Sequence, residues 1–313
     1  MAIKIKTYLR LLKESATAFI DDNGMKLCAS LAYYTVFAIG PLLLVILSLA
    51  GLFFEQEAVN GKVVYQIQSL VGAEGAATIM DIIKNMQQQN TATKFSIIGI
   101  VVLIISATGV FAEIQDSINY IWSIKAKPKK GWLKYLKDRL LSFSLIVGIG
   151  FLLIVSLLAS TVVDALTERL QMMFADVAVI FFLILNHVIT YIVVSGMFAV
   201  IYRVLPDARI AWKDALIGAS FTGVLFLIGK IAIGLYLGNS DFGNTYGAAA
   251  SIIILLSWVY YSAIILYFGA EFTKVYALNE GAGIKPYETA VFVVKEEAKE
   301  LPHKHHKGGV ADA

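Results

Sequence analysis

Long apolar runs separated by short polar connections form the main pattern of this chain. A helix needs about 20 mostly apolar residues to cross a hydrocarbon core about 30 Å thick. Backbone groups in lipid must be hydrogen-bonded within the segment, so we expect such runs to be helices. The pattern therefore predicts an all-α, polytopic membrane protein with six transmembrane helices. The predicted spans are Leu27–Phe54, Phe95–Gln115, Leu140–Val163, Val177–Tyr202, Ala215–Gly238 and Gly247–Glu271.

The remaining polar residues divide the chain into three parts. In residues 1–26, apolar side chains recur every three or four positions among Lys and Arg, which is typical of an amphipathic helix lying in the headgroup plane. Residues 27–277 hold the six spans and a long outer connection, 55–94, whose spacing predicts two short amphipathic helices. Residues 278–313 are polar and are predicted to form a disordered cytoplasmic tail.

The distribution of charge predicts the orientation of the helices. Hydrophobic residues make up 58% of the chain and charged residues 16%, a balance that excludes an ordinary soluble globule. Most of the 26 Lys and Arg residues lie in the N-terminal segment, the second and fourth connections and the tail. Because cytoplasmic loops carry the excess of Lys and Arg, both termini are predicted to be cytoplasmic. The single cysteine, Cys28, excludes an intramolecular disulfide and is expected to be a core residue.

The second connection, Lys125–Arg139, mixes cations with Trp132 and Tyr135, and Trp122 and Trp212 are predicted at similar depth. We interpret these aromatic residues as an interface belt. Basic runs also occur in nucleic-acid-binding proteins. The position of this run beside two spans favours membrane lipids and their anionic headgroups as partners, so no nucleic acid is expected.

Four segments in order resemble a known family. They are AYYTVFAIGPLLL (Ala32–Leu44), AEIQDSINYIW (Ala112–Trp122), YRVLPDARIAWKDALIGA (Tyr202–Ala219) and YGAAASIIILLSWVYYSAIILYFGAEFTKVYA (Tyr246–Ala277). Together they are similar to the YihY / virulence factor BrkB family, formerly labelled ribonuclease BN-like. The resemblance implies a six-helix, multi-pass protein of the bacterial inner (cytoplasmic) membrane. It implies no single function, because members are linked to serum resistance, to lipid or lipopolysaccharide export, or to the ribonuclease label.

Gly40 and Pro41 fall in the middle of the first span. Proline removes a backbone donor and clashes with the preceding turn, so we expect a helix break or kink there. Freed carbonyl groups at this depth line a cavity in transporters with broken helices. A packing kink without a further role is an equally good interpretation.

Lys230 is a charged residue deep inside the fifth span. Small residues share its helical face, so we expect the ammonium group to point into the bundle, although snorkelling to the headgroups is the alternative. A charge at this depth is a functional hypothesis by default. It would belong to a polar layer that binds an anionic headgroup, or in which His187 relays protons; hydrogen bonding between helices is the competing explanation. The layer contains Lys230, Asn186, His187, Ser257 and Ser106.

Charged and polar residues, among them Asn119 and Asp207, crowd the predicted cytoplasmic ends of the spans. Spacings of three and four residues place several on one helical face, so ion pairs between helices are feasible. We favour an architectural ion-pair network, with a cytoplasmic gate or headgroup site as the alternative. The predicted network contains Glu113, Asp116, Arg203, Arg209 and Glu271.

Motifs for catalysis are missing from the sequence, which has no P-loop, G-x-S-x-G, H-E-x-x-H or CxxC. Three of the four histidines, His303, His305 and His306, lie in the tail, away from any ordered scaffold for a nuclease metal. We therefore expect no enzyme, no catalytic residue, no metal and no cofactor.

The leading functional hypothesis is a transporter or export factor for a lipid or another amphipathic molecule. The sequence has no ATP site, so a gradient, a concentration difference or a partner protein would supply the energy. A non-transporting envelope scaffold or serum-resistance factor with a protein partner is the alternative, and a ribonuclease is least favoured. Gly234 and Gly238 would pack helices within one chain or between two, which leaves the oligomeric state open.

Overall fold

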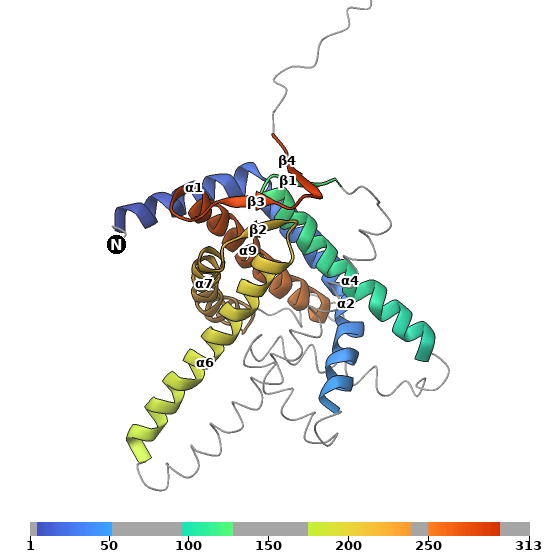
Figure 1. The fold of residues 1–313 in the computed structure, drawn as a ribbon. Helices are drawn as coiled ribbons and strands as arrows, with labels where there is room; N and C mark the ends of the chain where they lie inside the picture. The colour runs from blue at the N-terminus through green and yellow to red at the C-terminus, as the bar shows by residue number, and fades with distance from the viewer. Residues whose placement is uncertain (1–4, 52–95, 128–174, 239–249, 295–313) are drawn as a thin grey trace, which may run out of the picture.

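The computed structural model describes residues 5–51, 96–127, 175–238 and 250–294, most of which are helical (Figure 1). The described helices are α1 (Ile5–Asp21), α2 (Gly24–Gly51), α4 (Ser96–Ile121), α6 (Ala175–Val204), α7 (Trp212–Gly238) and α9 (Ala250–Asn279). The described strands are β1 (Ile124–Ala126), β2 (Ala208–Ile210), β3 (Ile284–Pro286) and β4 (Ala290–Phe292).

Five of the predicted spans overlap helices of the structure, namely α2, α4, α6, α7 and α9. The third span, Leu140–Val163, and the outer connection, 55–94, lie outside the described residues. Apolar side chains are exposed along α6 and α7, as expected for helices that face lipid. By length and composition, three helical stretches among the described residues are able to cross a membrane: His187–Val204, Trp212–Tyr236 and Ile253–Asn279.

The helices converge at one end of the molecule, where α1 and the four strands also lie (Figure 1). A buried core there joins the starts of α2 and α7 to the ends of α4, α6 and α9. Cys28 is buried in this core, which confirms its prediction as a core residue. We call this region the helix junction; it includes Cys28, Ile118, Trp122, Tyr202, Leu205, Ala215 and Tyr267.

Two glycine–threonine pairs let α7 and α9 approach each other closely. Thr273 of α9 fills the space beside Gly218 of α7, and Thr222 of α7 fills the space beside Gly269 of α9. The Thr222 hydroxyl donates to the Gly218 carbonyl at 2.8 Å, and the Thr273 hydroxyl donates to the Gly269 carbonyl at 2.6 Å. Each threonine thus satisfies its hydroxyl within its own helix, so the contact needs no other polar partner.

The short strands tie together connections that are far apart in sequence. β1, which follows α4, pairs antiparallel with β4, and β2, which follows α6, pairs antiparallel with β3. Because β3 and β4 both follow α9, three connections lie on one side of the molecule. The fold is therefore mainly helical with two small sheets, which differs from the all-α prediction. Residues 280–294 are folded where the sequence predicts disorder, because their backbone groups pair with these connections.

Helix α1 packs on the end of α9. Leu11 is buried against Phe272, Val275 and Tyr276. The opposite edge of α1 carries exposed apolar side chains, and Ile20 is 74% exposed. This division between a protein-facing and an outward-facing apolar edge suits a helix at a membrane surface.

Candidate functional site

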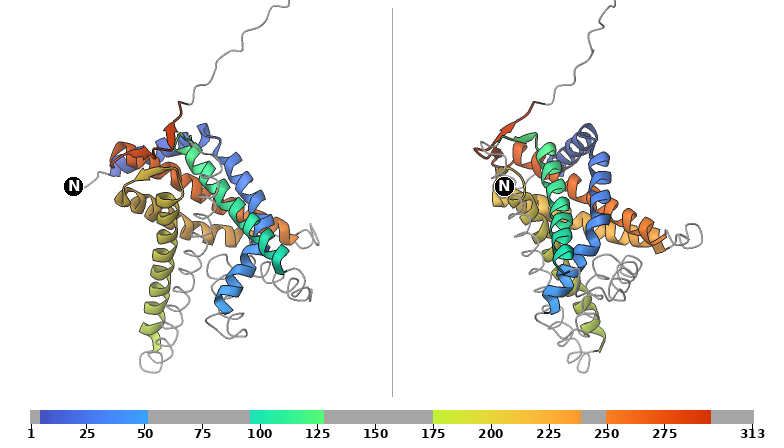
Figure 2. Two further views of the ribbon diagram at one scale, coloured as in Figure 1. Left: turned by 45° about the vertical axis from the view of Figure 1, so that its right-hand side comes forward. Right: turned by 90° about the vertical axis from the view of Figure 1, so that its right-hand side faces the viewer.

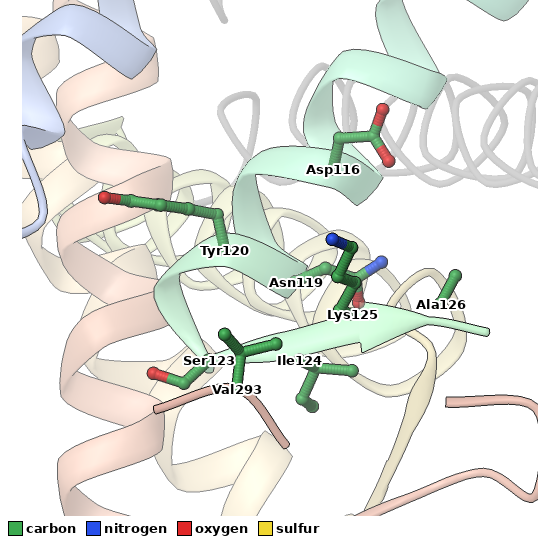
Figure 3. Close-up of a pocket in the computed structure, with 8 residues that line it drawn as sticks. All are labelled: Asp116, Asn119, Tyr120, Ser123, Ile124, Lys125, Ala126 and Val293. Atoms are coloured by element: carbon green, nitrogen blue, oxygen red, sulfur yellow. The ribbon is translucent and has the colours of Figure 1, made fainter. Parts of the chain in front are cut away.

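A pocket of about 340 Å³ lies at the end of α4, beside the helix junction (Figure 3). The last turns of α4, the strand β1 and one residue that follows β4 form its walls. Polar and apolar side chains therefore face the same space. The lining residues are Asp116, Asn119, Tyr120, Ser123, Ile124, Lys125, Ala126 and Val293.

A tight turn after α4 shapes the pocket. Ser123 has a left-handed φ of 55°, and its N–H donates to the Tyr120 carbonyl at 3.0 Å. The Ser123 carbonyl accepts a hydrogen bond from the Val293 N–H at 2.8 Å. In β1, Lys125 is paired with Val291. The strand pairing thus brings residues from the end of the described chain to the wall of the pocket.

Asn119 forms a fixed inner wall of the pocket and is only 6% exposed. Its Nδ2 donates to Asp207 Oδ2 at 2.9 Å, and its Oδ1 accepts from the Asp207 N–H at 2.8 Å. Asp207 lies in the connection between α6 and β2. The position of the pocket wall therefore depends on α6 as well as on α4.

Asp116 and Lys125 give the pocket two groups of opposite charge, and both side chains are exposed. Figure 3 shows the Lys125 side chain rising from β1 toward the part of α4 that carries Asp116. Ile124 and Val293 add apolar surface on the other side of the lining. A pocket with a carboxylate, an ammonium group and an apolar wall suits a ligand that carries both charges and a hydrocarbon portion.

A buried charged cluster lies in the helix junction, at the same end of α4. Its centre is Lys274, whose Nζ donates to the Ile121 carbonyl at 2.6 Å. The same Nζ lies 3.2 Å from Glu271 Oε2 and 3.5 Å from Asp22 Oδ2. The cluster therefore joins the turn between α1 and α2, the end of α4 and the helix α9. Its members are Asp22, Glu271 and Lys274.

The residues of the predicted ion-pair network lie at this end of the molecule but have other partners. The Arg203 guanidinium lies 5.7 Å from the centre of the Trp212 ring, and that of Arg209 lies 5.5 Å from the centre of the Tyr287 ring. Glu271 pairs with Lys274. Within the described parts of the chain, no ion pair joins two of the five predicted members. Glu113 is half-buried on α4, and Asp116 lines the pocket.

Lys230 is half-buried and lies on the protected side of α7. At 100° per residue, the buried Ala219 and Gly223 share its helical face. Exposed apolar residues such as Ile228 and Ile231 occupy a different face. Lys230 thus lies on a different face from the exposed stripe of α7, and its predicted orientation into the bundle stays a prediction.

The other predicted members of the polar layer lie on three helices. His187 is exposed on α6, and Ser257 is half-buried on α9. Asn186 lies in α6 and Ser106 in α4, and the structure describes only the backbone at these two positions. Convergence of the layer around Lys230 therefore stays a prediction.

Gly40 and Pro41 lie within α2, which continues as a helix through both residues. Figure 2 shows that the ribbon of α2 changes direction part way along its length. A bend in the first span agrees with a proline in that helix. The origin of the bend at Pro41 stays a prediction.

Trp122 corrects one interpretation of the aromatic residues. Its side chain is 2% exposed, and its Nε1 donates to the Ala270 carbonyl at 3.1 Å. Trp122 is therefore a core residue and not part of an interface belt, because the turn after α4 folds it back onto α9. Trp212, by contrast, is 53% exposed, as an interface residue should be. Trp132 and Tyr135 lie outside the described residues.

The buried cluster contains two residues that the sequence did not single out, Asp22 and Lys274. Asn119 and Asp207 were expected at the cytoplasmic ends of the spans, but nothing in the sequence pairs them with each other. In the sequence, Lys274 is one of several cations that follow the last span, and Asp22 is part of a polar N-terminal segment. Lys274 could have been found from its position just after the last predicted span. The ends of helices on one side of a membrane meet in a bundle, so a charged residue there is expected to have partners on other helices.

Comparison with known proteins gives a family match over most of the chain. A sequence model described as Virulence factor BrkB matches residues 15–291. A UPF0761 membrane protein of Aliivibrio fischeri (strain ATCC 700601 / ES114) is 28% identical over 303 residues, which are 94% of this chain and 90% of the relative. No solved structure matches.

Two other relatives are longer than the part that this chain matches. A UPF0761 membrane protein of Saccharophagus degradans is 28% identical over 83% of this chain and 58% of its own length. One of Tolumonas auensis is 29% identical over 58% of this chain and 58% of its own length. The chain thus spans somewhat more than half of these two proteins.

Proposed function

The chain belongs to the BrkB virulence factor family of membrane proteins, and from this premise we propose that it moves a lipid or another amphipathic molecule across the bacterial inner membrane. The pocket at the end of α4 is the observation that carries the proposal. Its Asp116 and Lys125 suit the cation and the anion of a zwitterionic phospholipid headgroup. Its apolar wall, which includes Val293, suits the start of the acyl chains.

The proposed topology has six spans with both termini in the cytoplasm. The strand pairs support it, because the connections after α4 and α6 and the segment after α9 must then share one side. The starts and ends of the helices in the helix junction agree with the same arrangement. Lysines and arginines concentrate in these connections, which supports a cytoplasmic position for this side.

The pocket would then lie at the level of the inner-leaflet headgroups. Trp212, at the start of α7, supports this depth because its exposed ring is typical of the membrane interface. The Arg203 guanidinium beside that ring adds a cation at the same end of the bundle. A headgroup would enter from the cytoplasmic leaflet and bind at the end of α4.

Lys230 supplies the second proposed contact along the path. Its half-buried ammonium group lies away from the exposed apolar stripe of α7. A cation in that position attracts the phosphate of a headgroup that leaves the pocket and lowers the cost of moving it through the apolar core. Because the sequence has no P-loop, the energy would come from a gradient or from a partner.

The experiment is a lipid-movement assay in reconstituted vesicles with fluorescent phosphoethanolamine and phosphoglycerol lipids. We expect Asp116→Asn and Lys125→Gln to reduce movement of the zwitterionic lipid, with a smaller effect of Asp116→Asn on the anionic lipid. Lys127→Gln is the matched control, because Lys127 is an exposed cation just after β1 and outside the pocket. An absence of lipid movement by the parent protein, together with recovery of a stable stoichiometric protein partner, would favour the scaffold instead.

A further inference from the structure

Glu271 has a fully buried carboxyl group in the helix junction. Its side chain is 0% exposed, and its Oε2 accepts a hydrogen bond from Lys274 Nζ at 3.2 Å. Its second oxygen, Oε1, is buried and has no hydrogen-bond partner among the described residues. A buried acceptor without a donor is destabilising, and more so when the group is charged. Binding a proton or a hydrogen-bond donor at Oε1 would therefore stabilise the folded chain.

Lys274 has no further hydrogen to offer to that oxygen. A lysine ammonium group has three N–H donors. Lys274 directs them at the Ile121 carbonyl, at Glu271 Oε2 and at Asp22 Oδ2. Lys274 thus shares one positive charge between two carboxylates, and a proton on either of them removes the repulsion between the pair.

We propose that Glu271 reversibly binds a proton, and that the cluster of Asp22, Glu271 and Lys274 is a proton-exchange site. A proton on Oε1 neutralises the Glu271 carboxylate and turns the unpartnered atom into a hydroxyl donor. Asp22, in the turn between α1 and α2, is the second carboxyl group that interacts electrostatically with Glu271. A proton fits this site better than a metal ion, since no cluster of three potential metal ligands occurs in the described part of the chain.

Among the described residues, two other charged groups face Glu271, namely Asp22 and Lys274. From α4 the nearby group is the uncharged carbonyl of Ile121. Glu113 and Asp116 also lie on α4, but their electrostatic interaction is with Tyr267, one turn earlier in α9. Because Asp22 and Lys274 belong to different elements, a shift of α9 against the turn before α2 changes the charge that Glu271 faces. Such a shift would load or release the proton, whatever the transported substrate.

Infrared difference spectroscopy of the full chain in lipid nanodiscs tests this inference without a transport assay. A protonated, buried carboxyl group gives a carbonyl band that is separate from the carboxylate bands. We expect this band in acidic buffer, its reversible loss as the pH rises, and its absence at every pH in Glu271→Gln. Glu280→Gln is the matched control and should keep the band, because Glu280 is an exposed acid just after the same helix.

Several outcomes would overturn the inference: no such band in the parent protein, a band that persists in Glu271→Gln, or a band lost in Asp22→Asn but kept in Glu271→Gln. If Glu271→Gln does not fold, the parent protein labelled with ¹³C-glutamate tests whether a glutamate carries the proton, and Glu271 is then identified as the glutamate with a fully buried side chain. The band must then move to lower frequency, whereas an unmoved band would assign the proton to another residue type.

Discussion

Asn119 and Asp207 hold each other through two hydrogen bonds, although 88 positions separate them in the sequence. One bond joins the two side chains, and the other joins the Asn119 side chain to the Asp207 main chain. Together they fix the end of α4 against the connection that follows α6. The pair thus connects a wall of the pocket to the end of α6.

Asn119→Ala should destabilise the protein and weaken the pocket. The change removes two hydrogen bonds from the half-buried Asp207, one to its carboxylate and one from its N–H, for which a loss of about 1.5–3 kcal/mol is expected. Thermal unfolding in detergent measures it as a lower midpoint. Asn279→Ala is the control, because Asn279 is exposed and its side-chain bond to Glu14 is an exposed one. Equal midpoints for both variants would contradict a structural role of the Asn119–Asp207 pair.

The helices could be predicted from the sequence because α2, α4, α6, α7 and α9 are long apolar runs and α1 has a clear amphipathic spacing. The strands were not, because three residues carry no useful periodicity and their partners are remote: Ala126 pairs with Ala290, and Ala208 pairs with Pro286. Burial of Trp122 was missed for a related reason. Its depth could be read from its position after the span, but the left-handed turn at Ser123 that folds this connection could not.

The same limit applies to the charged residues at the helix junction. Their position at one end of the bundle follows from the spans, but their partners depend on side-chain geometry. Arg203 lies against an aromatic ring and Glu271 pairs with Lys274, only three residues along α9. Whether a cation contacts a carboxylate, a carbonyl group or an aromatic ring depends on side-chain positions that differ by a few ångströms. Sequence spacing does not resolve such differences.

Gly218→Ala and Gly234→Ala should have opposite effects on stability. Alanine in place of glycine normally stabilises a helix by about 0.5–1 kcal/mol. No heavy atom of the described residues lies within 4 Å of a Cβ placed on Gly234, so this gain should be kept there. A Cβ on Gly218 would lie 2.8 Å from the Thr273 Cβ and would overlap its hydroxyl, which forces α7 and α9 apart. Thermal midpoints that move in the same direction would show that the glycine–threonine contact is not a tight one.

Two truncated chains should show which part of the C-terminal segment contributes to folding. A chain that stops after Gly283 loses β3 and β4 and uncovers Ile210, which is 2% exposed in the full structure. We expect a lower yield of monodisperse protein and faster proteolysis at the connections after α4 and α6. A chain that stops after Val294 keeps both strand pairs and should behave like the full chain. Similar behaviour of the two truncated chains would mean that the strands contribute little.

Lys230→Ala should abolish lipid movement while leaving the thermal midpoint nearly unchanged. The ammonium group is proposed to attract a passing phosphate, and its half-buried position is not part of the buried core. Lys230→Arg keeps the charge and should keep part of the activity. Lys213→Ala is the control, because Lys213 is an exposed cation at the start of the same helix. Unchanged lipid movement in Lys230→Ala would remove this residue from the proposed path.

Site-directed spin labels should distinguish the environments of positions 230 and 231. With Cys28 replaced by alanine, a label at Ile231 replaces a side chain that is 63% exposed on the apolar stripe of α7, so it should collide mainly with oxygen dissolved in the acyl chains. A label at Lys230 lies about 100° around the helix, on the face of Ala219 and Gly223, and should collide more with a water-soluble relaxation agent. A path that admits a charged headgroup must be hydrated, whereas a lysine that faces lipid needs no such path. If the label at position 230 shows the higher oxygen accessibility, the ammonium group faces the acyl chains and does not line a route for the substrate.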